Sequence, residues 1–133
     1  MKKVVIVACG THRASGYSCT GEWRCLKAAA LGQGNFVEPS QVVAFVSCEC
    51  PGYTVIPTLV QSEELSGIRP DAIHISTCLT QVKPKCPYRS TEELARLIEN
   101  KTGIPVVLGS HPYPNHGPKQ LPADINIELK NIF

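Results

Sequence analysis

The chain has 133 residues, a formal net charge of +2 and 43% hydrophobic residues. A chain of this length folds most simply as one compact domain, with a core large enough that cross-links are not needed to hold it together. Its charges are mixed without a basic block, which argues against a nucleic-acid surface. The N-terminal apolar run Val4–Ala8 is shorter than the core of a secretory signal, and no other segment approaches membrane-spanning length. We therefore expect a soluble cytoplasmic protein that does not bind membranes.

The first half of the chain predicts a strand, a helix and a second strand. The nearly continuous apolar runs Lys3–Ala8 and Gln41–Val46 are typical of strands buried on both faces of a parallel sheet. Residues 21–31 between them have helical composition, and Gly32 follows where a left-handed residue commonly ends a helix. The polar, glycine-flanked segment 10–16 is expected to be a loop.

The second half continues the alternation of strands and helices. A helix over about residues 54–65 leads to a strand over Ala72–Ser76. Ser90 and Glu93 form a capping-box pattern that marks a third helix, and Pro105–Leu108 predicts the fourth strand. This order predicts a three-layer α/β sandwich with a four-stranded parallel sheet, flavodoxin-like in its strand order.

The predicted elements divide the chain into two parts. Residues 1–111 are expected to form the α/β domain. Residues 112–133 contain four prolines before a final apolar stretch, and we expect them to form a C-terminal extension that packs on the domain or on a partner subunit.

Residue types that bind metals fall where the predicted strands end. Cys9 ends the first strand, Cys48 and Cys50 end the second, Cys78 follows the third and His111 follows the fourth. Because the carboxyl ends of parallel strands converge on the crevice where ligands bind, we expect these residues at one edge of the sheet. The connections above that edge carry the remaining cysteines, Cys19, Cys25 and Cys86. Seven cysteines in a reducing compartment indicate metal binding or redox chemistry.

The cysteine spacing bears on which metal is expected. Thiolates select zinc, copper(I) or iron–sulfur clusters over magnesium or calcium. Cys48 and Cys50 are separated by one residue, about 6.6 Å in an extended strand, whereas two sulfurs on one zinc ion lie roughly 3.8 Å apart. The chain contains no Cys-x-x-Cys pair. We therefore place an iron–sulfur cluster slightly ahead of zinc.

A family resemblance rests on the order of several short motifs. These are Cys-Gly after the first strand, Ser-Cys-x-Cys-Pro-Gly after the second, His-Ile-Ser-Thr-Cys at the third, then Cys-Pro-Tyr and Lys-Thr-Gly-Ile-Pro-Val-Val-Leu-Gly-Ser-His. Over residues 3–111 this order resembles the CGGC-domain family, although Cys48-Glu49-Cys50 is one residue shorter than the motif that names it. The resemblance implies metal binding and implies the characteristic positions Cys9, Cys19, Cys25, Cys48, Cys50, Cys78, Cys86 and His111.

Several functions fit such a site. A metal centre would serve redox or electron transfer, metal delivery or metal sensing, with a redox or metal-handling protein as partner and a homodimer as an open alternative. Zinc-dependent hydrolysis would also need a general base, and no residue is a convincing candidate. The alternative is a metal-free, thiol-dependent oxidoreductase with Cys48, Cys50 or Cys9 as its nucleophile.

The remaining histidines and two aromatic residues are given structural roles. His74 lies inside the third strand and is expected to be a satisfied core histidine or to support a ligand. His12 and His116 are expected in loops that face the solvent. Trp23 and Tyr53 are expected to pack or to shield the site from water.

Overall fold

The computed structural model describes residues 1–15, 19, 21–81 and 85–112 of the chain. The strands are β1 (Lys2–Cys9), β2 (Ser40–Cys48), β3 (Ala72–Ile75) and β4 (Val106–Leu108). The helices are α1 (Gly10–Ser15), α2 (Trp23–Leu31), α3 (Val55–Ser66), α4 (Thr77–Thr80) and α5 (Thr91–Thr102). Apart from Pro112, the predicted C-terminal extension lies outside the described residues.

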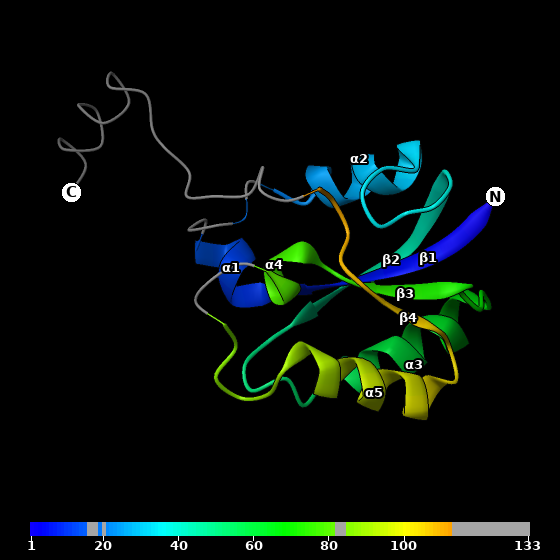
Figure 1. The fold of residues 1–133 in the computed structure, drawn as a ribbon. Helices are drawn as coiled ribbons and strands as arrows, with labels where there is room; N and C mark the ends of the chain where they lie inside the picture. Colours follow the sequence, from blue (N-terminus) through cyan, green and yellow to red (C-terminus); the bar gives the residue numbers. More distant parts are fainter. Residues whose placement is uncertain (16–18, 20, 82–84, 113–133) are drawn as a thin grey trace, which may run out of the picture.

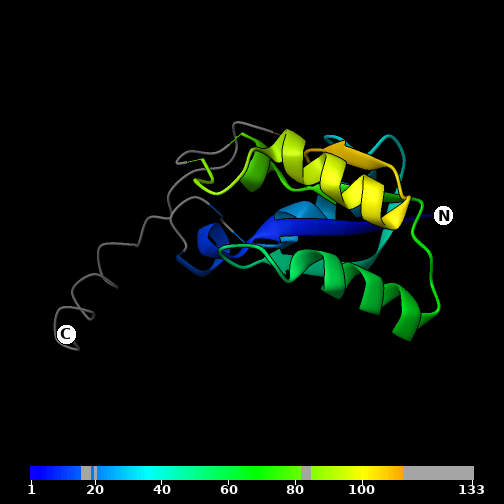
Figure 2. The same ribbon diagram turned by 90° about the horizontal axis from the view of Figure 1, so that it is seen from below.

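The four strands form one parallel sheet in the order β2-β1-β3-β4. This is the flavodoxin-like order expected from the sequence, and the chain reverses direction across the sheet after β2. Helix α2 covers one face, and α3 and α5 cover the other, so the three-layer sandwich is confirmed (Figure 1). Figure 2 shows α3 and α5 lying side by side on their shared face.

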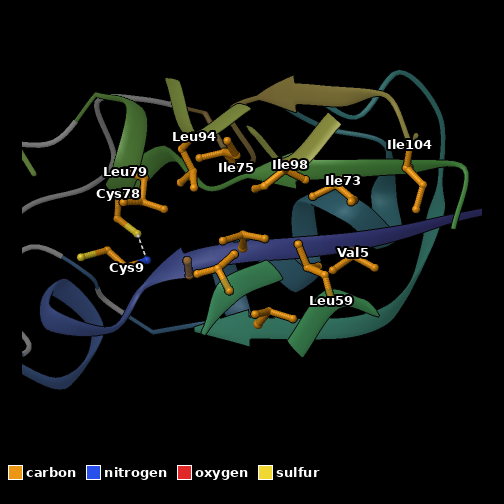
Figure 3. Close-up of a cluster of buried hydrophobic side chains, with 14 residues drawn as sticks. Val5, Cys9, Leu59, Ile73, Ile75, Cys78, Leu79, Leu94, Ile98 and Ile104 are labelled. Atoms are coloured by element: carbon orange, nitrogen blue, oxygen red, sulfur yellow. Dashed lines mark hydrogen bonds between the residues drawn. The ribbon is translucent and has the colours of Figure 1, made fainter. Parts of the chain in front are cut away.

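The alternation of side chains along β1 divides the core between the two faces. Val5 and Val7 belong to a cluster with residues of α3 and α5, which Figure 3 shows with Cys9 and Cys78 at one end. Val4 and Ile6 belong to a second cluster, which packs against α2. A residue at a strand end therefore faces either the α3 and α5 layer or the α2 layer.

The β1–β2 pairing contains an irregularity that affects the site. Val4 pairs with Val42 and Val5 pairs with Ala44, so Val43 is an extra residue in β2. A bulge of this kind shifts the pairing of all later residues by one. As a result Cys9 pairs with Cys48 at the carboxyl end of the two strands.

The helix boundaries agree closely with the sequence signals, but two short helices were not predicted. The Ser90 side chain accepts a hydrogen bond from the Glu93 backbone N–H, as the capping pattern requires. Residues 10–15 form α1 instead of the expected loop, and α4 follows β3 directly. Helices of four to six residues are too short to show hydrophobic periodicity, which explains why the sequence did not reveal them. No helix in the described part of the chain combines the length and the hydrophobicity needed to cross a bilayer.

The loop after α2 presses directly against the segment that follows β4. The Asn35 backbone N–H donates to the Ser110 carbonyl oxygen at 2.9 Å. Gly34 has a φ of +60°, and a Cβ placed on it would collide with that same carbonyl oxygen. The absence of a side chain at Gly34 therefore allows the two backbones to meet.

We predict that Gly34→Ala destabilises the protein by more than Gly67→Ala. Gly67 has a similar φ of +71°, but nothing lies within 4 Å of a Cβ built there. Gly67→Ala should cost roughly 1–2 kcal/mol, the penalty of a left-handed L-residue, whereas Gly34→Ala adds a steric collision. Urea denaturation of both variants measures the difference, and equal losses in the free energy of unfolding would contradict the close backbone contact.

Candidate functional site

The ends of β1 and β2 and the start of α4 bring three thiols together at the carboxyl edge of the sheet. Cys9 and Cys48 are paired across the two strands. Cys78 lies in α4. The Cys9 backbone N–H donates a hydrogen bond to the Cys78 Sγ atom, with 3.5 Å between nitrogen and sulfur (Figure 3). All three pack with the core cluster on the α3 and α5 face.

Two more thiols lie beside Cys48. Cys48, Cys50 and Cys86 line a small hollow that also contacts Arg89 and the first residues of α5. Its volume of about 20 Å³ accommodates one water-sized species. Cys50 is exposed, whereas Cys48 and Cys86 are half-buried, so the hollow communicates with solvent through Cys50.

The ionisation of Cys48 depends on burial and on the thiols around it. Burial raises the pKa of Cys48 to about 11, and the neighbouring Cys9, Cys86 and Cys50 thiols add to the rise. Arg89 opposes that rise in the pKa of Cys48 because its positive charge favours the thiolate. Cys9, Cys50 and Cys86 therefore lie close enough to Cys48 to affect its ionisation.

Local hydrogen bonds moderate the effect of burial on Cys9. Burial raises the pKa of Cys9, while the backbone N–H groups of His12 and Thr11 oppose the rise. These N–H groups belong to α1, which begins immediately after Cys9. The unpredicted helix thus provides donors for the Cys9 sulfur.

Cys78 is a buried thiol with a polar partner. Burial raises its pKa to about 11, and hydrogen bonds from Ser76 and from the Cys9 backbone oppose the rise. The Ser76 Oγ atom lies 2.8 Å from the Cys78 Sγ atom. Cys78 is therefore protonated at neutral pH when no cation is near it.

Cys25 and His111 lie on the other side of the sheet, against α2. The Cys25 Sγ atom is 3.2 Å from the Ser110 Oγ atom, and burial raises the pKa of this thiol. His111 is buried, its Nδ1 atom donates to the Pro112 carbonyl oxygen at 3.0 Å, and burial lowers its pKa. Cys19 is buried and acts electrostatically on both Cys25 and Cys78.

The structure thus divides the predicted ligand set. Cys9, Cys48, Cys50, Cys78 and Cys86 gather on the α3 and α5 side of the carboxyl edge, whereas Cys25 and His111 lie on the α2 side. Among the described residues, no three Cys, His, Asp or Glu side chains are arranged to hold a metal ion without moving. The assignment of all eight positions as metal ligands stays a prediction.

The structure also places the histidines and aromatic residues that were not predicted to bind metal. His74 is a core histidine whose ring stacks on Phe36 and whose Nδ1 atom is hydrogen-bonded to the Gly109 carbonyl oxygen at 3.0 Å, as expected.

The expectation that His12 faces solvent was wrong, because His12 lies in α1 and its side chain is buried. Trp23 and Tyr53 are 54% and 77% exposed, so neither is buried over a site. His116 lies outside the described residues.

Sequence reasoning missed Arg89. It lines the thiol hollow and acts on Cys48, yet it lies before a helix cap, where an arginine is unremarkable. Its position three residues after Cys86 was the available signal.

Comparison with known proteins identifies relatives of the chain. The family model of the CGGC domain matches residues 3–111. The uncharacterized protein MJ0582 of Methanocaldococcus jannaschii is 32% identical over 115 residues, which cover 82% of this chain and 86% of the relative. No solved structure matches the chain.

We predict that the metal-free protein loses stability as the pH rises from 9 to 11. The Cys78 thiol has its ordinary pKa of 9.0 when unfolded and a pKa of about 11 when folded. Below pH 9 the thiol is protonated in both states, and its contribution to the free energy of unfolding is fully present. As the pH rises the unfolded state loses this proton before the folded state does, so above pH 11 that contribution is lost. The loss is on the order of 3 kcal/mol.

Chemical denaturation at several pH values measures this dependence. Lysines and tyrosines also titrate in this range, so the informative quantity is the difference between the wild type and Cys78→Ala. The variant should show the shallower dependence, and identical pH profiles would contradict the protonated, buried state of Cys78.

Proposed function

Because this chain belongs to the CGGC-domain family, a cysteine-rich family to which metal binding is attributed, we propose that it binds a thiophilic metal at the carboxyl edge of its sheet. The observation that carries this proposal is the gathering of Cys9, Cys48, Cys50 and Cys86, because Cys9 is paired with Cys48 and the other two line one hollow with Cys48. These residues come from β1, from the end of β2 and from the segment before α5. Their soft donor atoms match zinc, copper(I) or iron.

This donor set suits a cation because a positive charge favours the thiolate form of cysteine. Burial, together with the neighbouring Cys9, Cys86 and Cys50 thiols, raises the pKa of Cys48 and so opposes its ionisation in the absence of a cation. A metal bound there would supply the positive charge that keeps the sulfurs deprotonated. Cys48, Cys50 and Cys86 already line one hollow and Cys9 is paired with Cys48, so rotation of these side chains is the change that would bring the sulfurs around one ion.

The size of the hollow favours one ion over a cluster. A space of about 20 Å³ between Cys48, Cys50 and Cys86 holds one water-sized species. An iron–sulfur cluster, the slight preference from the sequence, is larger than this space. We therefore propose a mononuclear site, with zinc as the ion that best matches a thiolate-rich donor set.

The exposure of the site favours metal handling or sensing as its role. Cys50 is exposed at the mouth of the hollow, so an ion held there is accessible to ligands from a partner protein. In the alternative, a metal-free oxidoreductase with Cys48, Cys50 or Cys9 as its nucleophile, Cys9 and Cys48 are the less favoured nucleophiles, because burial raises the pKa of both and so disfavours their thiolate form.

We predict that the protein purified without oxygen carries about one metal ion per chain, and that Cys48→Ser combined with Cys50→Ser lowers this content at least tenfold. Cys25→Ser is the matched control, because Cys25 is a buried cysteine on the opposite face of the sheet and should retain the metal. Elemental analysis for zinc, iron and copper, with acid-labile sulfide and visible absorption, measures the content.

The outcomes separate the alternatives. Zinc in a colourless protein supports the mononuclear site, whereas stoichiometric iron and sulfide would replace it with a cluster. A folded, metal-free protein that gains no metal on incubation would overturn the proposed function, as would equal losses from the Cys25 variant and the Cys48 and Cys50 variant.

A further inference from the structure

A second hollow lies on the α2 side of the molecule, away from the thiol hollow. Its volume is about 120 Å³. It is lined by one aromatic, three polar or basic side chains and one buried imidazole, namely Trp23, Arg24, Lys27, Gln33 and His111. None of these residues lines the thiol hollow, which lies on the α3 and α5 side.

The charged side chains that line this hollow in the described part of the chain are basic. Arg24 and Lys27 are three residues apart in α2, so their side chains leave the same face of the helix. None of the described lining residues is acidic. In the described part of the chain the ion pairs are Arg13 with Glu22 and Arg69 with Glu63, and neither Arg24 nor Lys27 takes part in one there. The described lining residues therefore give the hollow a positive charge from Arg24 and Lys27, and this charge favours a bound anion.

The walls of the hollow are held in place by backbone contacts. The Gln33 backbone N–H donates to the Ala28 carbonyl oxygen at 2.8 Å, which ties the loop to α2. On the opposite wall, the Thr77 Oγ1 atom donates to the His111 carbonyl oxygen at 2.8 Å. The close contact at Gly34 joins the two walls. A ligand therefore meets a site that is largely formed already, which lowers the entropic cost of binding.

We propose that this hollow binds a phosphate group, held by Arg24 and Lys27. An arginine guanidinium can contact two phosphate oxygens at once, and a lysine ammonium adds a point charge. A hollow of about 120 Å³ is small beside the roughly 300–1,000 Å³ of sites that enclose a whole organic ligand. It therefore holds a single anionic group, either free inorganic phosphate or the phosphate of a larger molecule whose remainder lies outside, near the exposed Trp23 ring.

The structure provides a direct reporter for this binding. Trp23 is the chain's single tryptophan, and the Arg24 guanidinium carbon lies 5.3 Å from the centre of its ring. A phosphate that draws the guanidinium away from the ring changes the electrostatic surroundings of the indole. The intrinsic fluorescence of the protein should therefore respond to occupancy of this hollow.

The test is a fluorescence titration of the full-length protein with inorganic phosphate at constant ionic strength, with chloride as the balancing anion. We expect a saturable change in Trp23 emission. Lys27→Met keeps most of the side-chain length while removing its charge, and it should weaken phosphate binding by about tenfold or more. Lys101→Met removes an exposed lysine from α5 and is the matched control, expected to leave the affinity unchanged.

Calorimetry with adenosine monophosphate distinguishes the two sources of the phosphate group. Tighter binding than inorganic phosphate supports a phosphate carried on a larger molecule, and equal or weaker binding supports the free ion. Absence of a saturable response to both ligands would overturn the proposal, as would equal affinities of the wild type and Lys27→Met. Protein stripped of metal by a chelator should bind phosphate as before, so this result is independent of the thiol site.

Discussion

The pairing of Cys9 with Cys48 is the constraint on which the thiol site depends. The extra residue at Val43 shifts β2 by one position against β1, so the two cysteines end their strands side by side. Without that bulge Cys9 would pair with Ser47, and Cys48 would lie one residue further along the strand. Because a shift of one residue turns a strand's side chains to the opposite face, the bulge decides which face of the sheet receives the sulfur of Cys48.

Two chemically different surfaces follow from the alternation of faces at the carboxyl edge. The α3 and α5 side gathers thiols around a small hollow, and burial raises the pKa of Cys48 there, which keeps this thiol protonated until a cation arrives. The α2 side gathers Arg24 and Lys27 around a hollow suited to an anion. The buried hydrogen bonds between Thr77 and Ser110 lie between these sides and tie α4 to the end of β4.

Much of the fold could be predicted because its signals are local. Continuous apolar runs marked the strands, and the Ser90 and Glu93 pattern marked the start of α5. The convergence of strand ends followed from parallel topology, which placed Cys9 and Cys48 at one edge. These predictions needed only periodicity, capping chemistry and the direction of the chain.

The division of the ligand set could not be predicted from the same signals. Cys25 faces the sheet because the apolar side of α2 does, and that orientation places it against Ser110 on the far face from Cys48. The bulge at Val43 leaves no trace in the apolar pattern of β2, since its neighbours are also hydrophobic. The burial of His12 depends on α1, whose six residues are too few to show a helical period.

X-ray absorption at the edge of the metal bound to the purified protein tests the central claim most directly, because it identifies the atoms that surround the ion. Coordination by the thiolates of the carboxyl edge predicts a first shell dominated by sulfur, at about 2.3 Å for zinc. A first shell made only of nitrogen and oxygen would contradict a thiolate metal site in this protein.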